Sequence, residues 1–395
     1  LVDIPYSIRA MEYFANQARE INGMTIPIPG EEAFDWVTYE PYGVVGAITP
    51  WNFPLHLATR AVCPAMATGN TVVAKASSLS PVTPILMGEI LEEAGVPAGV
   101  VNILSGPGST TGEALISHPD VSMITFTGSL EIGRKILEAS SKSPIIKKTI
   151  LELGGKGPFI AEADCNMDDA VNQLIKGFCL MQGEVCCAST RLMLNEKIYD
   201  EFMEKLVNRV ESLKIGDNLD PKTQLGAMIS EGQLDLVDER VKNAVKEGAK
   251  LVTGGERHTE QPCDKGFFYK PTILTDVKNT MTCAREEIFG PVLVVIKYKD
   301  IDEAIKMAND NQYALGASVY SENIRTLFYA SKKIDAGTVW LNTNVMSKIE
   351  APYGGNKNSG LGREDGIIGL KEYTKVKNNV LNLSDKIDNF YNFKM

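Results

Sequence analysis

Apolar residues along the first part of the chain follow two different periods. Residues 6–21 have them three and four positions apart, which predicts an amphipathic helix. Residues 24–43 mix prolines with alternating polar and apolar positions, which predicts extended strands and turns that leave the main body. Beyond residue 43, short apolar runs alternate with helical patterns and predict these elements: strands at 43–50, 71–75, 99–104, 121–128 and 147–155, and helices at 83–95, 110–118 and 129–140.

A second alternating region follows Gly155. Strands and helices in alternation form parallel βαβ units, so the sequence predicts an α/β fold with a doubly wound sheet. Glycines interrupt the pattern near residues 154–157 and mark the predicted boundary between two domains. The elements predicted after it are helices at 168–178, 198–213 and 237–250, and strands at 292–298 and 337–342.

The composition is that of an ordinary globular protein and excludes some partners. The chain has 395 residues, 44% hydrophobic and 23% charged, which is enough for two or three domains. Its formal net charge of −10 argues against nucleic acid, because phosphate binding needs concentrated Lys and Arg. We find no apolar run of membrane-spanning length and no secretory signal, so no membrane partner is expected.

Seven cysteines and three histidines limit the metal and redox chemistry of the chain. The cysteines are odd in number, form no C-x-x-C pair and show no clustered ligand spacing with histidine. A disulfide framework and a metal site are therefore not expected, and a reducing cytoplasmic location is predicted.

Two adjacent cysteines, Cys186 and Cys187, lie in the stretch "QGEVCCASTR". A buried free cysteine is common and inert, so a structural role is the default for either residue. A nucleophile would need a thiolate stabilised by a helix end, a cation or a base. The Cys–His pair of hydrolases has weak support, because the histidines lie in no recognisable partner pattern, but this alternative stays open.

Three other stretches contain candidates with equally plain structural explanations. Gly128 and Gly133 lie where a strand passes into a helix, which suits either a turn or an anion site. Glu152 ends an apolar strand, so it is either a salt-bridge partner or a base whose pKa is raised by burial. Asn52, held between prolines and aromatics in "TPWNFP", is a turn residue or an oxyanion donor.

Taken together and in order, seven stretches resemble the aldehyde dehydrogenase superfamily. They are "TPWNFP", "GNTVVAK", "FTGSLEIG", "LELGGKGP", "GEVCCASTR", "EEIFGPV" and "PYGGNKNSGLGRE". The resemblance implies a Rossmann-like cofactor domain, an α/β catalytic domain and a small β oligomerisation element. The implied boundaries are 1–22 and 42–153 for the NAD(P)-binding domain, 154–365 for the catalytic domain, and 23–41 and 366–395 for the oligomerisation segments.

The resemblance also implies an activity and catalytic roles. The activity is oxidation of an aldehyde to a carboxylic acid with NAD(P)⁺, through a thiohemiacetal and a thioester on a cysteine. Counting from Gly183 in the family motif makes Cys186 the nucleophile and Cys187 its neighbour. Glu152 matches the general base that activates water, and Asn52 matches the oxyanion donor.

Cofactor contacts follow from the same resemblance. Lys75 and Glu287 match residues that hold the two riboses of the dinucleotide, and Phe289 matches one that packs near the nicotinamide. Trp51, Gly128, Ser129 and Gly133 are implied on the phosphate-binding side of the cofactor.

The sequence departs from the family pattern at several points. Glu184 stands where a Gln is usual, and we expect it to point away from Cys186; Met181 replaces a common Asn. Ser78 stands where a Glu often binds the adenosine ribose. Because Ser78 would not repel a 2′-phosphate, NADP is expected to be accepted and slightly favoured over NAD. Family members also carry more chain before the segment that resembles residues 6–21.

Substrate and partners are predicted only in outline. The loop at residues 342–355 offers Asn, Ser, Lys and Glu, which mildly favours a small polar aldehyde. Exposed edge strands at 24–41 and near the C-terminus predict a homodimer or homotetramer. Two alternatives remain beside the leading function: a relative that passes the thioester to coenzyme A, and a non-catalytic structural or binding protein that keeps the fold.

Overall fold

A six-stranded sheet holds the first half of the chain in the computed structural model, which describes residues 2–30, 32–346, 348–385 and 390–391. Its order is β17-β7-β6-β3-β4-β5, and all neighbouring strands are parallel except β17, which runs antiparallel to β7. The strands are β3 (Val44–Ile48), β4 (Thr71–Lys75), β5 (Val101–Leu104), β6 (Val121–Thr127), β7 (Lys148–Glu152) and β17 (Gly360–Leu361). The helices of this part are α1 (Asp3–Gln17), α2 (Pro54–Ala67), α3 (Val82–Glu93), α4 (Glu113–Ser117), α5 (Leu130–Lys142) and α12 (Gly366–Glu372).

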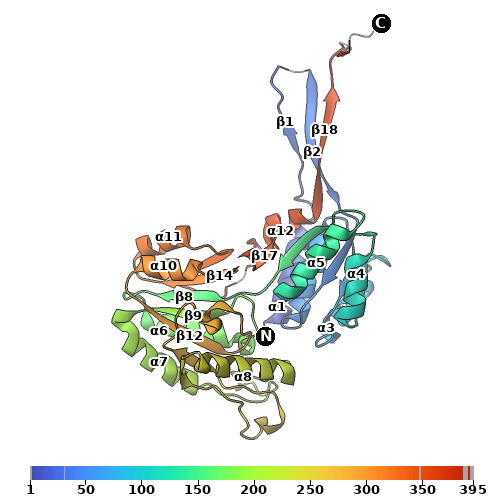
Figure 1. Ribbon diagram of the computed structural model, residues 1–395. Coiled ribbons are helices and arrows are strands. Elements are labelled where there is room, and N and C mark those ends of the chain that lie inside the picture. Colours follow the sequence, from blue (N-terminus) through green and yellow to red (C-terminus); the bar gives the residue numbers. More distant parts are fainter. Residues whose placement is uncertain (1, 31, 347, 386–389, 392–395) are drawn as a thin grey trace.

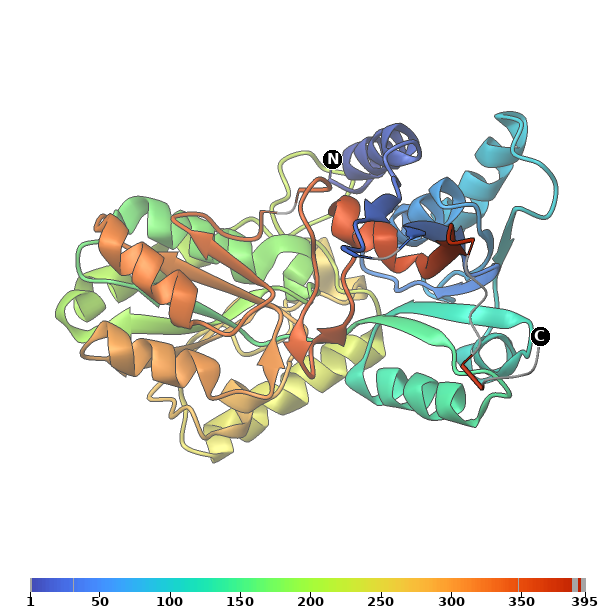
Figure 2. The same ribbon diagram turned by 90° about the horizontal axis from the view of Figure 1, so that it is seen from above.

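A seven-stranded sheet holds most of the second half, beside the first sheet (Figures 1 and 2). Its order is β10-β11-β12-β9-β8-β14-β15, with only β10 antiparallel to its neighbour. The strands are β8 (Gly157–Ala161), β9 (Ser189–Asn195), β10 (Lys250–Thr253), β11 (Thr272–Thr275), β12 (Val292–Tyr298), β14 (Gly316–Tyr320) and β15 (Thr338–Leu341). Its helices are α6 (Met167–Cys179), α7 (Tyr199–Glu211), α8 (Glu231–Lys246), α9 (Thr282–Arg285), α10 (Ile301–Asn309) and α11 (Ile324–Lys333).

A three-stranded ribbon projects away from both sheets (Figure 1). It consists of β1 (Met24–Ile26), β2 (Ala33–Pro41) and β18 (Thr374–Asn382), all antiparallel, and β2 and β18 pair over nine positions. A two-stranded sheet of β13 (Tyr313–Ala314) and β16 (Asn356–Lys357) lies elsewhere in the chain. Among the described residues, no helix has the length and apolar character needed to cross a bilayer.

The predicted α/β class is confirmed, and the differences from the expected elements have local causes. The helix expected at 6–21 begins at Asp3 and ends at Gln17. Helix α2 has no sequence prediction, because it is buried on most sides and contains Pro64, so it shows no amphipathic period. Its first turn is capped by another helix, since the Asp3 carboxylate accepts from the N–H groups of Leu55 and His56 at 3.1 and 3.0 Å.

Short strands of the second sheet escape prediction for a related reason. Strands β8 and β14 are buried at every position, so their residues do not alternate between polar and apolar. Each is five residues long, and β8 contains Pro158. Periodicity cannot identify such strands. They are recognised only by their parallel pairing in the sheet, where β8 lies between β9 and β14.

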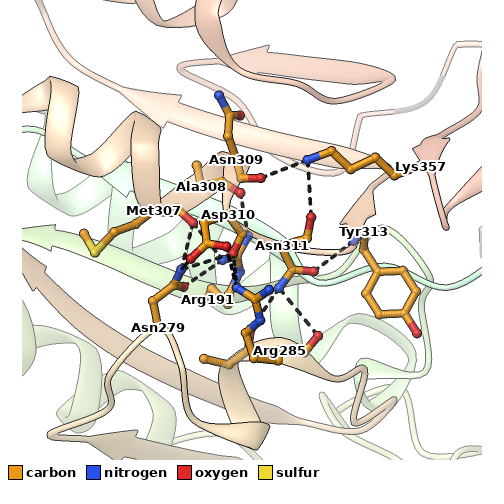
Figure 3. Close-up of polar contacts among 11 residues, drawn as sticks. Arg191, Asn279, Arg285, Met307, Ala308, Asn309, Asp310, Asn311, Tyr313 and Lys357 are labelled. Atoms are coloured by element: carbon orange, nitrogen blue, oxygen red, sulfur yellow. Dashed lines mark hydrogen bonds and ion pairs between the residues drawn. The ribbon is translucent and has the colours of Figure 1, made fainter.

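A buried guanidinium, Arg191 of β9, ties the second sheet to helix α10 (Figure 3). Its Nε donates to the carbonyl of Lys156 at 2.9 Å, and its Nη1 donates to Asn279 Oδ1 at 3.0 Å. Its Nη2 donates to the carbonyl of Ala308 at 3.0 Å, in the last turn of α10. Burial lowers the pKa of Arg191 to about 9, so these acceptors are needed to hold the charged form in the core.

Two more cations meet the same helix end (Figure 3). Lys357 Nζ donates to the carbonyl of Asn309 at 2.8 Å, and Arg285 pairs with Asp310 at 2.9 Å. Cations at a helix C-terminus are stabilised by its unpaired carbonyls and by the helix dipole. The arrangement fixes the chain just before Gln312 and Tyr313, which border the large cleft described below.

Candidate active site

The cysteine pair lies in a turn directly before β9, and the backbone ahead of it is unusual. Ala188 N–H donates to the carbonyl of Val185 at 3.1 Å, which closes the turn around Cys186 and Cys187. Met181, Gln182 and Gly183 precede it, all with positive φ, at 50°, 58° and 73°. Left-handed backbone is rare for residues other than glycine and is often found where function over-determines the geometry.

Two cavities meet at this turn. A cleft of about 680 Å³ is bordered by residues of both sheets, among them Trp51, Gly128, Ser129, Glu287 and Phe289. A smaller cavity of about 100 Å³ lies against α1 and α2 and is bordered by Tyr6, Phe53, Val345 and Tyr353, among others. Asn52 and Cys186 border both cavities.

The glycines after Glu152 let the two sheets approach each other. A Cβ on Gly155 would lie 2.2 Å from the carbonyl oxygen of Cys186, and one on Gly154 would lie 2.4 Å from Glu287 Oε2. The contact at Gly155 does not tolerate a side chain, because it is with a backbone oxygen, whereas a side chain at residue 154 would have to displace the end of Glu287. The glycine pair therefore places the end of β7 directly against the cysteine turn.

Asn52 is tied to the cysteine turn by a hydrogen bond. It follows β3 and precedes α2, and only 7% of its surface is exposed. Its Nδ2 donates to the carbonyl of Glu184 at 2.8 Å. One amide hydrogen is thus fixed, which orients the second hydrogen of the same nitrogen.

Glu152 is a buried carboxylate with no hydrogen bond to either oxygen from the described residues. It is 1% exposed and lies against Gly354, where a Cβ would be 2.6 Å from Glu152 Oε1. Burial is the main cause that raises its pKa well above the usual value; the charge of Glu364 and the Cys186 thiol add to the rise, and Arg60 opposes it. Such a carboxylate binds a proton more readily than an exposed one does, which suits a general base.

A buried ion pair that the sequence did not indicate lies behind these residues. Arg60 Nε is 2.5 Å from Glu364 Oε2, and Arg60 Nη1 is 4.0 Å from Asp365. The guanidinium also lies over the ring of Tyr353, 5.1 Å from its centroid. In the sequence, Arg60 and Glu364 look like ordinary surface charges. Only the structure shows that both are buried.

The sulfur of Cys186 faces a hydroxyl group and no charged imidazole. Cys186 Sγ is 3.7 Å from Tyr353 Oη. The neighbouring Cys187 side chain and burial raise the pKa of the Cys186 thiol well above its usual value, while Arg60 and the Tyr353 hydroxyl lower it. His56 borders the small cavity, but burial and the nearby Arg60 lower its pKa to about 3, so it stays neutral. His56 is packed in α2, where it is 8% exposed.

The N-terminus of α5 opens into the large cleft. Ser129 caps the helix, accepting from Ile132 N–H at 3.4 Å, and Gly128 precedes it. A Cβ on Gly128 would lie 2.5 Å from the ring of Phe126, so this position needs glycine. Gly133 does not border the cleft; a Cβ there would meet Leu153 Cδ2 at 2.7 Å, so this glycine permits close packing of α5 on β7. A glycine followed by a capped helix N-terminus fits the pyrophosphate of a dinucleotide.

The opposite wall of the cleft is aromatic and acidic. The rings of Trp51 and Phe289 meet edge to face with centroids 5.4 Å apart, and Phe289 has a φ of 57°. Glu287 Oε1 accepts from Gly155 N–H at 2.9 Å, and burial raises its pKa to about 7. A flat aromatic ring and a ribose both fit such a wall, because it offers an apolar face beside a hydrogen-bond acceptor.

Comparisons with known proteins agree with this geometry. The model of the aldehyde dehydrogenase family matches residues 1–379. This chain belongs to the aldehyde dehydrogenase family. An aldehyde dehydrogenase of Enchytraeus buchholzi is 45% identical over 369 residues, which are 93% of this chain and 73% of the relative.

Solved structures of aldehyde dehydrogenases have the same fold. An NAD-dependent aldehyde dehydrogenase from Sinorhizobium meliloti superposes with a TM-score of 0.95 at 39% identity, over 98% of this chain and 76% of that chain. An NADP-dependent enzyme from E. coli superposes with a TM-score of 0.93 at 38% identity, over 96% and 78%. The chain is therefore an enzyme of the NAD(P)-dependent aldehyde dehydrogenase type.

Besides Gly133, two more of the cofactor residues expected in this aldehyde dehydrogenase lie away from the walls of the large cleft. Lys75 is the last residue of β4 and Ser78 lies in the turn after it. Ser78 Oγ donates to the carbonyl of Gly106, in the loop after the neighbouring strand β5. These residues lie at the carboxyl end of the sheet, where open α/β sheets bind nucleotides.

The loop at 342–355 does not supply the polar substrate lining that its sequence suggested. Asn344 is fully buried and bonds Ser189 and Ser318, and Glu350 pairs with Arg9 on the surface. The loop instead contributes Val345 and Tyr353 to the small cavity. The loop therefore gives no support to the expected small polar aldehyde, because Asn344 is used by Ser189, Ser318 and the carbonyl of Gln173, and Glu350 by Arg9. Ser347 lies outside the described residues.

No metal site is found in the part of the chain that the structure describes, where no three His, Cys, Asp or Glu side chains are placed to hold an ion. All seven cysteines are free.

Glu184 points away from Cys186, as expected from the sequence. Its Oε1 accepts from Ile229 N–H at 3.1 Å, and only 4% of its surface is exposed. Burial raises the pKa of Glu184 from its usual value of 4.5 to about 8, and the hydrogen bond from Ile229 partly offsets this rise. A carboxyl whose pKa is raised on folding stabilises the protein below its usual pKa, and this contribution is lost as the pH rises through about 8.

We expect Glu184→Gln to gain stability relative to the wild type as the pH rises. The amide oxygen still accepts from Ile229, and no buried carboxylate has to ionise. The difference in free energy of unfolding should grow between about pH 5 and about pH 9, measured by urea denaturation at each pH. Glu93→Gln, which removes an exposed carboxylate at the end of α3, serves as the control. A pH-independent difference would show that Glu184 is already ionised in the folded protein.

Proposed function

We propose that this chain oxidises an aldehyde to the free carboxylic acid with NAD(P)⁺, using Cys186 as the nucleophile. The observation that supports it most directly is that Asn52 and Cys186 border both cavities. A sulfur at this junction can bond to a carbonyl carbon entering from the small cavity. The same carbon then faces the large cleft, where a nicotinamide would lie.

Asn52 is proposed to stabilise the oxyanion formed when Cys186 attacks the aldehyde. The Nδ2 hydrogen not used by the carbonyl of Glu184 and the backbone N–H of Cys186 are the two donors. One such donor is typically worth about 3 kcal/mol in the transition state. The amide is already oriented in the free protein, so no reorganisation is needed at the moment of reaction.

The large cleft is proposed to hold the cofactor, which would supply the acceptor for the hydride. Gly128 and Ser129 at the N-terminus of α5 would bind its phosphates, and Trp51 and Phe289 would pack near the nicotinamide. Glu287 would accept from a ribose hydroxyl once its carboxylate is free of Gly155. Gly133 supports this site by letting α5 pack closely on the sheet.

Glu152 is proposed to take a proton from the water that hydrolyses the thioester on Cys186. Its buried oxygens have no hydrogen-bond partner among the described residues, so they can accept that proton without breaking a native contact. A coenzyme A-acylating enzyme does not need a water-activating base, which makes that alternative weaker. A non-catalytic role is also weaker, because nothing structural explains two unsatisfied carboxylate oxygens in the core.

Glu152→Gln should stop turnover after the thioester forms. Loss of a general base typically costs 10²- to 10⁴-fold, so hydrolysis should slow by about that factor. Mass spectrometry after mixing with aldehyde and cofactor should find the acyl group on Cys186. Cys186→Ala should show neither adduct nor turnover, whereas Cys187→Ala should retain both. An adduct on Cys187, or none under conditions that give product, contradicts the assignment.

The small cavity favours an uncharged, apolar aldehyde. Its walls are mainly aromatic and aliphatic, with Tyr6, Phe53, Leu57, Leu180 and Val345. The two charged side chains at its edge are already engaged: the Asp3 carboxylate caps α2, and Arg60 is paired with Glu364. An added charge on the substrate would therefore be buried without a partner.

Ser78 and Lys75 support acceptance of NADP. Lys75 Nζ pairs with no acidic group among the described residues, so it is available to a 2′-phosphate at the carboxyl end of β4. Ser78 brings no negative charge to the same turn. A carboxylate at residue 78 would repel the 2′-phosphate, and this chain has a serine there.

One panel of kinetic measurements tests both preferences. We expect the highest kcat/KM for a short aliphatic or aromatic aldehyde, with NADP used at least as well as NAD. Ser78→Glu should shift the ratio of kcat/KM toward NAD and leave the order of the aldehydes unchanged. Succinate semialdehyde and betaine aldehyde, which are charged, should be poor substrates. A strong NAD preference in the wild type, or a charged aldehyde at the top of the panel, contradicts the corresponding proposal.

We further propose that the ribbon of β1, β2 and β18 joins copies of the chain into a homodimer or homotetramer. On β18, Val376 and Val380 are 67% and 64% exposed, and Leu381 is 50% exposed. An exposed apolar edge favours pairing with a second copy.

Light scattering should show a dimer or tetramer that becomes smaller when Val376 and Val380 are both changed to Lys. A monomeric wild type contradicts the proposal. Of the proposed segment 366–395, residues 386–389 and 392–395 lie outside the described residues.

A further inference from the structure

The hydroxyl group of Tyr353, which borders the small cavity, lies close to the reacting sulfur. Tyr353 Oη is 3.7 Å from Cys186 Sγ, within hydrogen-bond range for sulfur. Nothing in the sequence pattern singled out this residue, although it lies in the quoted stretch "PYGGNKNSGLGRE". Its position raises the question of what a phenol does beside a nucleophilic thiol.

Both the backbone and the side chain of Tyr353 are held in place. Tyr353 and Glu364 exchange two backbone hydrogen bonds of 2.7 Å, an isolated bridge between two turns of chain. The side chain is 7% exposed and packs with Val185, Cys187 and Trp340. The hydroxyl is therefore aimed at the sulfur by the fold and pays little conformational entropy to stay there.

Other groups facing the sulfur do not provide this hydrogen bond. Cys187 is a second thiol, and Glu152 is a carboxyl that disfavours a nearby thiolate. Arg60 favours the thiolate by its charge, but its guanidinium is paired with Glu364. His56 is a neutral imidazole, since its pKa is lowered to about 3. Asn52 uses one hydrogen of its Nδ2 on the carbonyl of Glu184, and the second is assigned above to the oxyanion.

Arg60 also acts on the phenol itself. Its guanidinium lies 5.1 Å from the centroid of the Tyr353 ring. A cation over the ring withdraws electron density and makes the O–H group a stronger donor. The ion pair of Arg60 with Glu364 keeps the guanidinium in this position.

We propose that Tyr353 is a further catalytic residue, whose hydroxyl donates a hydrogen bond to the Cys186 thiolate and so keeps the sulfur ready for attack on the aldehyde. The proposal rests on the function proposed above, because it assumes that Cys186 is the nucleophile. The hydrogen bond offsets part of the rise in pKa that Cys187 and burial impose on a thiol with no histidine partner. Hydrogen bonds to a charged partner are the strong ones, and this one is made before substrate enters.

The test measures the ionisation of Cys186 without turnover. The full-length protein carrying Cys187→Ala is alkylated with iodoacetamide over a range of pH, and the label on the peptide containing Cys186 is quantified by mass spectrometry. Adding Tyr353→Phe should raise the apparent pKa of alkylation by about one unit, which slows labelling about tenfold at neutral pH. The value of kcat/KM should fall by a similar factor and recover in alkaline solution, while KM for the cofactor stays the same.

Tyr320→Phe is the matched control. Tyr320 is a buried tyrosine of β14 that borders neither of the two cavities and whose hydroxyl has no partner among the described residues. It should leave the alkylation profile unchanged. If Tyr353→Phe folds with the wild-type melting temperature and its alkylation profile coincides with that of the parent, the proposal is overturned. A rise in KM for aldehyde with an unshifted profile also overturns it, because the tyrosine would then be only a wall.

The outcomes separate this proposal from the one on which it rests. If Cys186→Ala retains aldehyde oxidation, the assigned nucleophile is wrong and the function proposed above fails. If Cys186 is essential but its ionisation does not depend on Tyr353, only the role of the tyrosine is lost.

Discussion

The close contact between Gly155 and the carbonyl of Cys186 is the constraint on which the site depends. Glu152 belongs to the first sheet and Cys186 precedes a strand of the second, so the base and the nucleophile come from different halves of the chain. A side chain at residue 155 would separate them, because its Cβ would lie 2.2 Å from that carbonyl oxygen. On the other side, the left-handed residues 181–183 bring the turn to this contact.

The electrostatic problem of such a site is that a thiol and a carboxyl must both ionise in the core. Desolvation opposes both, and each disfavours the charged form of the other. Arg60 is the one nearby cation that acts on both groups among the described residues. It is held by Glu364, so the net field at the sulfur is weaker than a free guanidinium would give. A neutral hydroxyl donor can favour the thiolate without adding charge, which is why Tyr353 matters in this setting.

Sequence patterns predicted the α/β class and the order of most elements in the first half, because those strands and amphipathic helices alternate clearly. They did not predict α2, β8 or β14, whose residues are buried on nearly every side; even the polar residues His56, Thr59 and Arg60 of α2 are buried. The resemblance carried by ordered motifs indicated Cys186, Glu152 and Asn52. Asn52 and Cys186 border both cavities, whereas Glu152 borders neither and is linked to Cys186 by the effect of the thiol on its pKa. Arg60, Glu364 and Tyr353 were missed because their roles arise from contacts between residues about 300 positions apart, which no local pattern contains.

The same buried ion pair bears on substrate choice. An arginine at the edge of an aldehyde cavity invites the idea of a carboxylate substrate, yet Arg60 is 5% exposed and lies 2.5 Å from Glu364, with Asp365 also near. A substrate carboxylate would have to displace one of these groups and leave it buried and unpaired, which costs several kcal/mol. The apolar walls and the pairing of Arg60 with Glu364 therefore both favour an uncharged aldehyde. Arg60 serves the chemistry at the sulfur through Tyr353, and recognition of the aldehyde is left to shape and apolar contact.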